Sequence, residues 1–241
     1  MCKYKKFLCF PQHEKKVTIF ACRKSTQRSM NSIKIKFSPA DGDPLIGQSK
    51  WWGMPDMPED LGYPMIPYDD GDDDPMTFVC QIRCSELAAF DPDNLLPHEG
   101  MLYFFAAIDE YLPGLESCES DYHNGMGEWS KEMFRVLYSP SSEDLKPHTI
   151  LDEDGLPYGL PAERIQFEVA DYNYESFKLL GRPYYDEIQE LFPDYLNLLQ
   201  IDESDEWLLR FYDCGMICFL IRPEDLRAGL FSNVIVYFHS F

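Results

Sequence analysis

The chain has 241 residues, of which 45% are hydrophobic and 15% aromatic, and its formal net charge is −21. This composition is typical of a folded globular protein and argues against intrinsic disorder. The apolar runs are far shorter than the roughly twenty residues that a membrane-spanning helix needs, so we expect no membrane partner.

The charges are distributed unevenly along the chain. Residues 1–37 hold ten Lys or Arg residues and a single acidic residue, Glu14, which leaves eleven basic and 41 acidic residues for the rest. An acidic body repels phosphate backbones, so nucleic acid is not an expected partner, whereas a basic protein is. Solubility is the simpler explanation of the same charge.

The first 29 residues differ from the rest. They are basic and lack hydrophobic periodicity, and we interpret residues 1–29 as a basic N-terminal extension, with Met30 as the natural start. The alternative is a basic arm that binds the acidic body. The segment lacks the apolar core and cleavage site of a signal peptide. A chain this long does not need its eight cysteines as disulfides, which favours reduced thiols and a cytoplasmic location.

Regular patterning begins with an alternating strand over residues 33–37. Residues 38–76, rich in Gly, Pro and Asp, form a predicted loop that contains Trp51, Trp52 and Tyr63. A loop this long is usually either functional or packed by its own side chains. The two tryptophans favour packing; if they are exposed instead, the three aromatic residues would form a protein-binding patch.

Two later strands are predicted to be buried on both faces. Residues 101–108 and 216–221 are apolar at every position, and each run follows a glycine, which is typical of strands covered on both sides. Further strands are expected at 77–82, 133–138, 165–169, 196–201, 207–211 and 234–238, and short helices at 185–191 and 223–229. We therefore predict an α+β fold that is β-rich, with mostly antiparallel sheets and short helices.

The two halves of the chain share an order of motifs. In each half a Gly-x-Pro turn (53–55 and 181–183) precedes an apolar strand that ends in Gln-Ile, and a strand that begins with Gly-Met follows. Three matches in the same order indicate an internal duplication. We therefore predict that residues 30–241 form a single domain made of two related halves, at about 30–140 and 160–241.

The same motifs are similar to those of a known family. The matching motifs are Ser49-Lys50 with Gly53-x-Pro55, the run from Phe78 to Ile82, Leu96-Pro97 with residues 100–105, Leu180-Gly181-x-Pro183, residues 198–201, Asp213 to Phe219, and Asp225-Leu226 with Phe231. In these motifs the chain resembles the YwqG-like bacterial proteins, a family named for a domain of unknown function. Trp52 stands where that family usually has Gly. The resemblance implies a soluble, β-rich protein of mixed α and β structure, and it brings no activity or catalytic residues.

Gln81 and Gln200 are the most informative polar residues, because each ends an apolar strand at the equivalent place in its half. A buried amide must be hydrogen-bonded. Either each amide holds its neighbouring loop, for instance the Gly-x-Pro turn, or the two amides line a shared cleft between the halves.

Metal sites are only weakly indicated. The pairs Cys80-x3-Cys84 and Cys214-x3-Cys218 lie in or beside apolar strands, which favours core thiols over a zinc site. The carboxylates of Asp69–Asp74 suit calcium, but the EF-hand spacing is missing. The sequence also lacks nucleophile and phosphate-binding motifs, and we expect neither a metal nor a cofactor.

These observations favour a cytoplasmic protein-binding module whose acidic surface meets, and could neutralise, a basic protein. The candidate residues for ligand or partner binding are Gln81, Gln200, Trp51, Trp52 and Tyr63. The alternative is an enzyme, generically a hydrolase, that acts on a small ligand in the cleft between the halves. A deep pocket with converging polar groups would favour the enzyme, and a flat acidic face with aromatic residues would favour the binding module.

Overall fold

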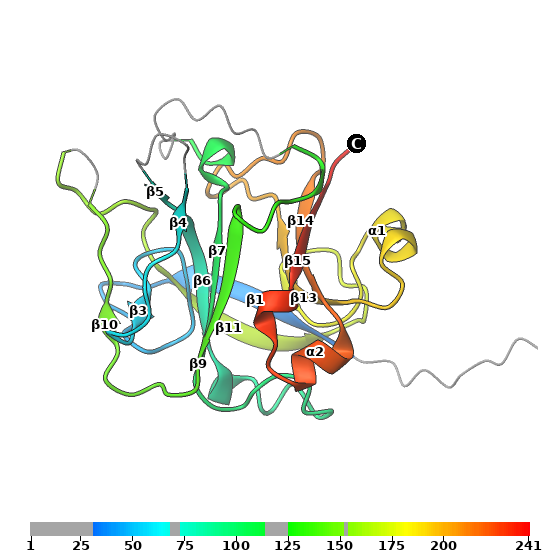
Figure 1. The fold of residues 1–241 in the computed structure, drawn as a ribbon, viewed down its shortest axis with the longest axis horizontal. Coiled ribbons are helices and arrows are strands. Elements are labelled where there is room, and N and C mark those ends of the chain that lie inside the picture. Colours follow the sequence, from blue (N-terminus) through cyan, green and yellow to red (C-terminus); the bar gives the residue numbers. More distant parts are fainter. Residues whose placement is uncertain (1–30, 68–72, 114–124, 152–153) are drawn as a thin grey trace, which may run out of the picture.

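The structure of the protein is a computed structural model. It describes residues 31–67, 73–113, 125–151 and 154–241 (Figure 1). The predicted N-terminal extension, residues 1–29, lies outside the described residues, as do residues 69–72 of the acidic stretch.

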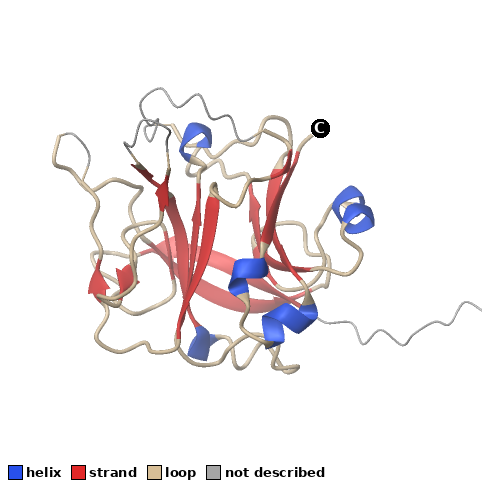
Figure 2. Ribbon diagram, in the orientation of Figure 1, coloured by secondary structure: helices blue, strands red, loops and turns tan. Residues whose placement is uncertain are grey.

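The described residues form fifteen β-strands and two short α-helices (Figure 2). The strands are β1 (Ser32–Pro39), β2 (Lys50–Trp51), β3 (Asp56–Met57), β4 (Met65–Ile66), β5 (Asp74–Pro75), β6 (Thr77–Arg83), β7 (Met101–Ala106), β8 (Gly127–Glu128), β9 (Phe134–Ser139), β10 (Lys146–Pro147), β11 (Glu163–Ala170), β12 (Lys178–Leu179), β13 (Leu196–Asp202), β14 (Met216–Ile221) and β15 (Ile235–His239). The helices are α1 (Asp186–Leu191) and α2 (Pro223–Arg227), and the 3-10 turns are η1 (Cys84–Glu86), η2 (Asp109–Tyr111) and η3 (Phe231–Asn233). Neither α-helix in the described ranges has the length and apolar character that crossing a membrane requires.

The prediction of an α+β fold is wrong, because the structure is mostly β (Figure 2). The two helices expected from the sequence are present as α1 and α2, but they are only six and five residues long. Helices this short depend on packing against the sheet and form no layer of their own. The segments between strands are mostly loops, since their many Gly, Pro and Asp residues favour turns over helix. The antiparallel pairing of the main sheet is as predicted.

Eleven strands form one curled sheet in the order β8-β15-β14-β13-β12-β1-β11-β2-β6-β7-β9. The other four strands form the two-stranded sheets β10-β3 and β4-β5. In Figure 1, strands β6, β7 and β9 stand as one wall and strands β13, β14 and β15 as another, while β1 and β11 cross from one wall to the other.

Apart from the edge strand β8, the strand order is symmetrical about the central β1–β11 pair. Strand β1 pairs with β12, where Lys34 lies opposite Lys178, and β11 pairs with β2, where Arg164 lies opposite Lys50. The first strand of each predicted half therefore joins the wall formed by the other half. A duplication would leave this arrangement; the common origin of the halves stays a prediction.

The hydrophobic core lies between the two walls. All six residues of β7 and all six of β14 are buried, as expected for strands that are apolar on both faces. Phe104 of β7 meets Phe219 of β14 edge to face, with ring centroids 5.5 Å apart. An aromatic pair of this kind contributes about 0.5–1.5 kcal/mol beyond the burial of its area. This contact therefore helps to hold the two walls together.

Candidate functional site

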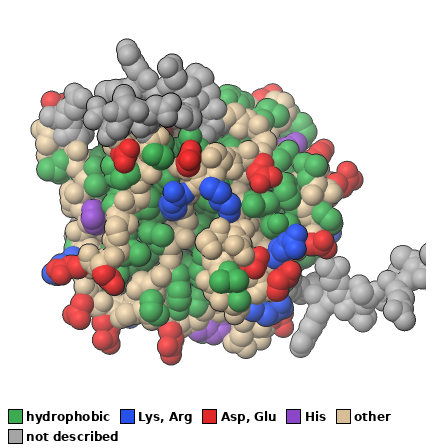
Figure 3. All heavy atoms as spheres, in the orientation of Figure 1, with side chains coloured by type: hydrophobic (Ala, Val, Ile, Leu, Met, Phe, Trp, Pro, Cys, Tyr) green, Lys and Arg blue, Asp and Glu red, His purple; other side chains and the backbone are tan. Residues whose placement is uncertain are grey.

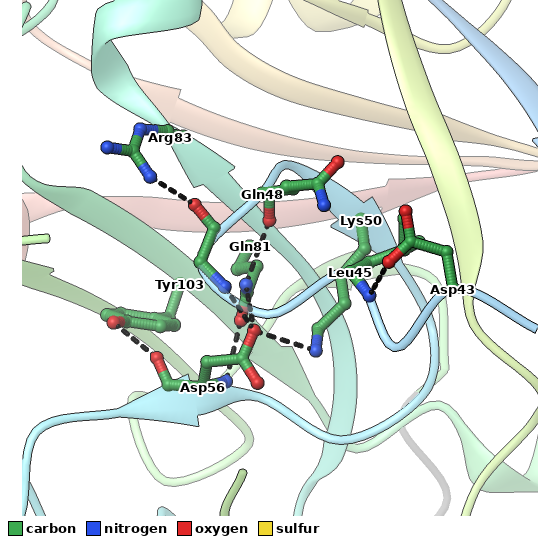
Figure 4. A network of polar contacts seen from close by, with 9 residues as sticks. Asp43, Leu45, Gln48, Lys50, Asp56, Gln81, Arg83 and Tyr103 are labelled. Atoms are coloured by element: carbon green, nitrogen blue, oxygen red, sulfur yellow. Dashed lines mark hydrogen bonds and ion pairs between the residues drawn. The ribbon is translucent and has the colours of Figure 1, made fainter. Parts of the chain in front are cut away.

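Three buried side chains from β2, β3 and β6 form a polar network (Figure 4). Lys50 of β2 and Gln81 of β6 are paired in strand register. Lys50 Nζ lies 2.8 Å from Asp56 Oδ2, and Gln81 Nε2 donates a 2.7 Å hydrogen bond to the same oxygen. The Gly47 backbone N–H donates to it as well, at 2.9 Å. Since the three side chains are at most 3% exposed, the ion pair is shielded from solvent.

Gln81 also holds the loop that follows the Gly53-Met54-Pro55 turn. Its Oε1 accepts a 2.7 Å hydrogen bond from the Asp56 backbone N–H, and its Nε2 donates to the Gln48 carbonyl at 2.9 Å. The Tyr103 hydroxyl donates to the Asp56 carbonyl at 2.7 Å. The amide is therefore fully engaged in fastening its neighbouring loop.

Gln200 makes the equivalent contacts in the second half. It pairs in register with Lys178 of β12, as Gln81 pairs with its own lysine. Its Oε1 accepts a hydrogen bond from the Tyr184 backbone N–H at 3.1 Å, and its Nε2 donates to the Ser176 carbonyl at 2.8 Å. Tyr184 thus stands where the buried aspartate stands in the first half, six residues after the lysine.

Lys178 is consequently a buried cation that has no carboxylate partner among the described residues. Its side chain is fully buried, and its Nζ donates a 2.5 Å hydrogen bond to the Tyr174 carbonyl. Burial lowers the pKa of Lys178 to about 8. Burial raises the pKa of the Cys218 thiol, which interacts with this lysine, to about 12. The two halves therefore share the amide contacts but differ in the pairing of the lysine.

The three aromatic candidates are packed against other side chains. Trp51 and Trp52 are 0% and 1% exposed, and their rings lie 6.0 and 5.5 Å from that of Trp207. Tyr63 packs on Phe105 at 5.1 Å and donates a 2.9 Å hydrogen bond from its hydroxyl to a backbone carbonyl. The tryptophans thus pack inward, as their adjacency favours, and this loop presents no tryptophan patch to a partner.

Other aromatic residues are exposed near the C-terminus. We define Tyr184, Tyr212, Asp213 and Phe241 as the C-terminal patch. Its three aromatic residues are 38%, 58% and 71% exposed. The Phe241 backbone N–H donates to the Asp213 carbonyl at 3.2 Å. The ring of Tyr185 links the patch, with centroids 5.2 Å from Tyr184 and 5.3 Å from Phe241. Sequence reasoning missed this surface, because its residues come from three separate segments and share no motif.

A polar pocket of about 490 Å³ lies in the surface of the second half. It lies between the Gly181-Arg182-Pro183 turn, α1, the segment 192–196 and the start of α2. Arg182 and Arg222 line it, and so do the aromatic residues Tyr172, Phe192 and Tyr195. We call it the arginine pocket. Neither Gln81 nor Gln200 lines it.

Another hollow, which we call the His98 groove, has a volume of about 420 Å³ and is lined by His98, Ser85, Ser141 and Ser142 among others. His98 Nε2 lies 3.4 Å from the Oδ2 of Asp91. Asp91 is only 2% exposed, and the same oxygen accepts a 2.7 Å hydrogen bond from a backbone N–H. A buried carboxylate that contacts a groove histidine is an arrangement suited to acid–base chemistry. Neither candidate glutamine lines this groove.

The described cysteines are free thiols. Cys80, Cys84 and Cys218 are buried, and Cys214 is exposed. Burial raises the pKa of Cys84 to about 12, which keeps this thiol protonated and a poor metal ligand. Within the described ranges, no three His, Cys, Asp or Glu side chains are grouped as metal ligands would be. The predicted calcium ligands of 69–72 lie outside those ranges.

The model of a protein family described as "Domain of unknown function (DUF1963)" matches residues 49–190 and 183–239. These two segments span most of the chain. The chain belongs to the DUF1963 family. Comparison with curated proteins gives no match.

The DUF1963 match covers both lysine–glutamine pairs and the linings of both hollows. Strand β1 precedes the matched segments, although it lies at the centre of the main sheet. The two matched segments overlap at residues 183–190, which include most of α1. The description of the family assigns no activity, so function has to be argued from the surfaces of this chain.

Proposed function

We propose that this DUF1963 protein is a cytoplasmic protein-binding module whose acidic surface receives a basic protein. The C-terminal patch carries the proposal, because exposed aromatic side chains are typical anchors of an interface and Asp213 beside them offers a carboxylate to a cation. A Lys or Arg of the partner would lie over the ring of Phe241 or Tyr212 and pair with Asp213.

The charge of the chain supports a basic partner. Beyond residue 37 it holds 41 acidic and eleven basic residues. Several of those cations are already paired within the protein (Lys50–Asp56, Arg164–Asp43, Lys146–Glu59). Figure 3 shows acidic side chains along the lower rim and the right side of one face. An excess of this size steers a cationic partner toward the surface and disfavours anionic ones.

The proposed compartment rests on the free thiols, because reduced cysteines persist in the cytoplasm. Within the DUF1963 family, a closer relation to the YwqG-like bacterial proteins is part of the same proposal. It is supported by the order of the shared motifs from Ser49 to Phe231.

A pull-down with the full chain tests the binding module. The baits are the wild type, a Tyr212→Ser/Phe241→Ser variant of the C-terminal patch, and a Leu191→Ser/Leu230→Ser control that removes two other exposed apolar side chains. We expect the wild type and the control to recover one basic protein in stoichiometric amount, and the patch variant to lose it. Rising salt should release it as well.

Equal recovery by all three baits would contradict the proposal, and so would the absence of any basic protein. Thermal melting of each bait separates loss of binding from loss of folding.

The His98 groove favours a second candidate function, the hydrolysis of a small ester. Buried Asp91 would orient His98 so that its imidazole takes a proton from a water molecule or a groove serine as that oxygen attacks the ester carbonyl. The imidazolium would return the proton to the leaving alcohol oxygen as the acyl–oxygen bond breaks, and water would hydrolyse an acyl-serine in the same way. The wild type should then hydrolyse p-nitrophenyl acetate above the background rate, and His98→Gln should lower this rate by about 10²-fold or more. His148→Gln, outside the groove, is the control. A rate that His98→Gln leaves unchanged would exclude this function.

A further inference from the structure

We propose that the arginine pocket binds a small molecule that carries one carboxylate or phosphate group. The pocket lies in the second half, and the proposal is independent of the basic partner argued above. Positive charge is rare in this protein. Only eleven basic residues lie beyond residue 37, against 41 acidic ones. Two of the eleven, Arg182 and Arg222, line the same hollow.

The two arginines come from different elements. Arg182 lies in the Gly-x-Pro turn that precedes α1, and Arg222 directly precedes α2. Each guanidinium presents a planar set of N–H donors that matches a carboxylate or a phosphate, and it keeps its charge at any physiological pH. Two guanidinium groups that line one polar pocket can bind an oxyanion through charge-assisted hydrogen bonds.

Both guanidinium groups are available to a ligand. Among the described residues, no carboxylate oxygen lies within 4.0 Å of the Arg182 guanidinium, and that of Arg222 has only a loose contact of 4.0 Å with Glu224. The Arg222 guanidinium carbon lies 5.3 Å from the centroid of the Tyr195 ring. A hydrogen bond with Tyr195 raises the pKa of Arg222 further above its usual range. The tyrosine therefore positions the guanidinium without neutralising it.

The turn that carries Arg182 is held rigidly. The Arg182 backbone N–H donates to the Tyr172 carbonyl at 2.9 Å, and the buried Gln189 donates to the Pro183 carbonyl at 2.6 Å. Gly181 has a φ of +80°, and a Cβ at this position would lie 2.3 Å from the Tyr172 carbonyl oxygen. A side chain on a fixed backbone loses less conformational entropy when it binds a ligand.

The other residues that line the arginine pocket narrow the class of ligand that it would bind. The rings of Tyr172, Phe192 and Tyr195 offer apolar and stacking surface. Asp194 and Glu224 also line the pocket and offset the two arginines. A polyphosphate would therefore meet repulsion, whereas a ligand with a single oxyanion and a flat apolar part meets complementary groups throughout.

Calorimetric titration of the full-length protein tests the proposal with three matched probes. Benzoate carries the carboxylate, phenyl phosphate carries the phosphate, and benzyl alcohol has a ring of the same size without charge. The titrations use a fixed salt concentration near 0.15 M, because surface attraction is weakened there. We expect saturable binding of benzoate or phenyl phosphate at millimolar concentrations, as fits ligands of this size. Whichever binds more tightly identifies the oxyanion.

The variants decide whether the arginines are responsible. Arg182→Gln and Arg222→Gln should each weaken binding about tenfold or more, because each removes charge-assisted hydrogen bonds. Arg227→Gln is the matched control, since Arg227 belongs to α2 but does not line the pocket. Its affinity should stay within about twofold of the wild type, because a charge outside the pocket is screened by salt.

Three results would overturn the proposal. The first is that neither charged probe binds saturably. The second is that benzyl alcohol binds as well as the charged probes, which would make the pocket merely apolar. The third is that Arg227→Gln weakens binding as much as the pocket variants, which would show a general effect of charge. Equal melting temperatures of the variants ensure that none of these results reflects unfolding.

Discussion

Replacement of Lys50 by methionine should cost far more stability than the same replacement of Lys178. Lys50 is the only cation within 4.0 Å of the Asp56 carboxylate in the part of the chain that the structure describes. In Lys50→Met this carboxylate would stay fully buried, with hydrogen bonds from the Gly47 N–H and Gln81 Nε2 but no opposite charge. Breaking a buried ion pair in this way costs about 3–5 kcal/mol.

In Lys178→Met, removal of a buried charge offsets the loss of the contact that the charge makes. The pKa of Lys178 falls from 10.5 to about 8 in the folded protein. At about 1.4 kcal/mol per pKa unit, the buried ammonium destabilises the fold at pH 7 by about 3 kcal/mol. The variant removes this cost and loses one charge-assisted hydrogen bond to the Tyr174 carbonyl, worth about 1–3 kcal/mol. We therefore expect Lys178→Met to be neutral or somewhat stabilising.

The difference in stability between the wild type and Lys178→Met should depend on pH with a definite sign. Between pH 8 and 10.5, folded Lys178 has lost its proton while the unfolded chain still holds it. The unfolded state then binds more protons, so the folded state gains stability as the pH rises. Relative to Lys178→Met, the wild type should gain up to about 3 kcal/mol across this window, and the difference should be constant below it.

Urea unfolding followed by tryptophan fluorescence, at pH 7 and pH 10, measures these differences. Lys36→Met is the control, because Lys36 forms an exposed ion pair with Glu168, for which we expect a change of less than about 1 kcal/mol. Equal losses for Lys50→Met and Lys178→Met at pH 7 would refute the reasoning. An unchanged difference between wild type and Lys178→Met from pH 7 to pH 10 would refute the assignment of the lowered pKa.

Three further substitutions test the packing, all by urea unfolding. Gly181→Ala should cost more than about 2 kcal/mol, because the new Cβ would meet the Tyr172 carbonyl oxygen at 2.3 Å. Gly155→Ala is the control, at a similar φ but with nothing within 4 Å of the new Cβ, and it should lose only about 1 kcal/mol through backbone strain. Gln81→Leu should cost about 2–4 kcal/mol, since it leaves buried backbone groups without their partner; a loss below about 1 kcal/mol would mean that this amide does not hold the loop. Phe104→Ala should cost about 3–5 kcal/mol through the cavity between the walls, and a smaller loss would show that the walls close over it.

Strands that are apolar on both faces could be predicted from local sequence alone. Residues 101–108 and 216–221 were expected as buried strands, and the structure has β7 at Met101–Ala106 and β14 at Met216–Ile221. A strand covered on both sides needs apolar side chains at consecutive positions, and that requirement is visible without knowing what covers it.

The same local reasoning failed where tertiary packing competes with propensity. A strand was predicted at 207–211, but only an isolated bridge between Ser204 and Leu209 forms there. Trp207 turns instead into the aromatic cluster around Trp51, because burying a large ring outweighs a weak preference for extended backbone. The α+β class failed for a related reason. The helix signals were local and correct, but a helix of six residues adds no layer to the fold.

The equivalence of Gln81 and Gln200 was predictable, because both follow the same run of apolar residues. That Gln81 lies beside a lysine paired with a carboxylate, and Gln200 beside one without a carboxylate partner among the described residues, was not predicted. Asp56 and Tyr184 stand at the same distance after their lysines in the sequence, but only the folded turns bring each of them back to the lysine–glutamine pair.

What the sequence by itself determined is the positions of the long apolar strands, the mostly antiparallel pairing and the acidic balance of the chain, since these depend on neighbours along the backbone and on composition. The two-residue strands, such as β2 and β12 beside the central pair, have no such local signal. Only the tertiary structure decided which charges meet. The convergence of Arg182 and Arg222 on one pocket, and of Tyr184 and Phe241 on one surface, comes from the strand order of the main sheet, which places β12, β13, β14 and β15 side by side. Coulomb forces and hydrogen bonds act over a few ångströms in space, and sequence distance says little about them.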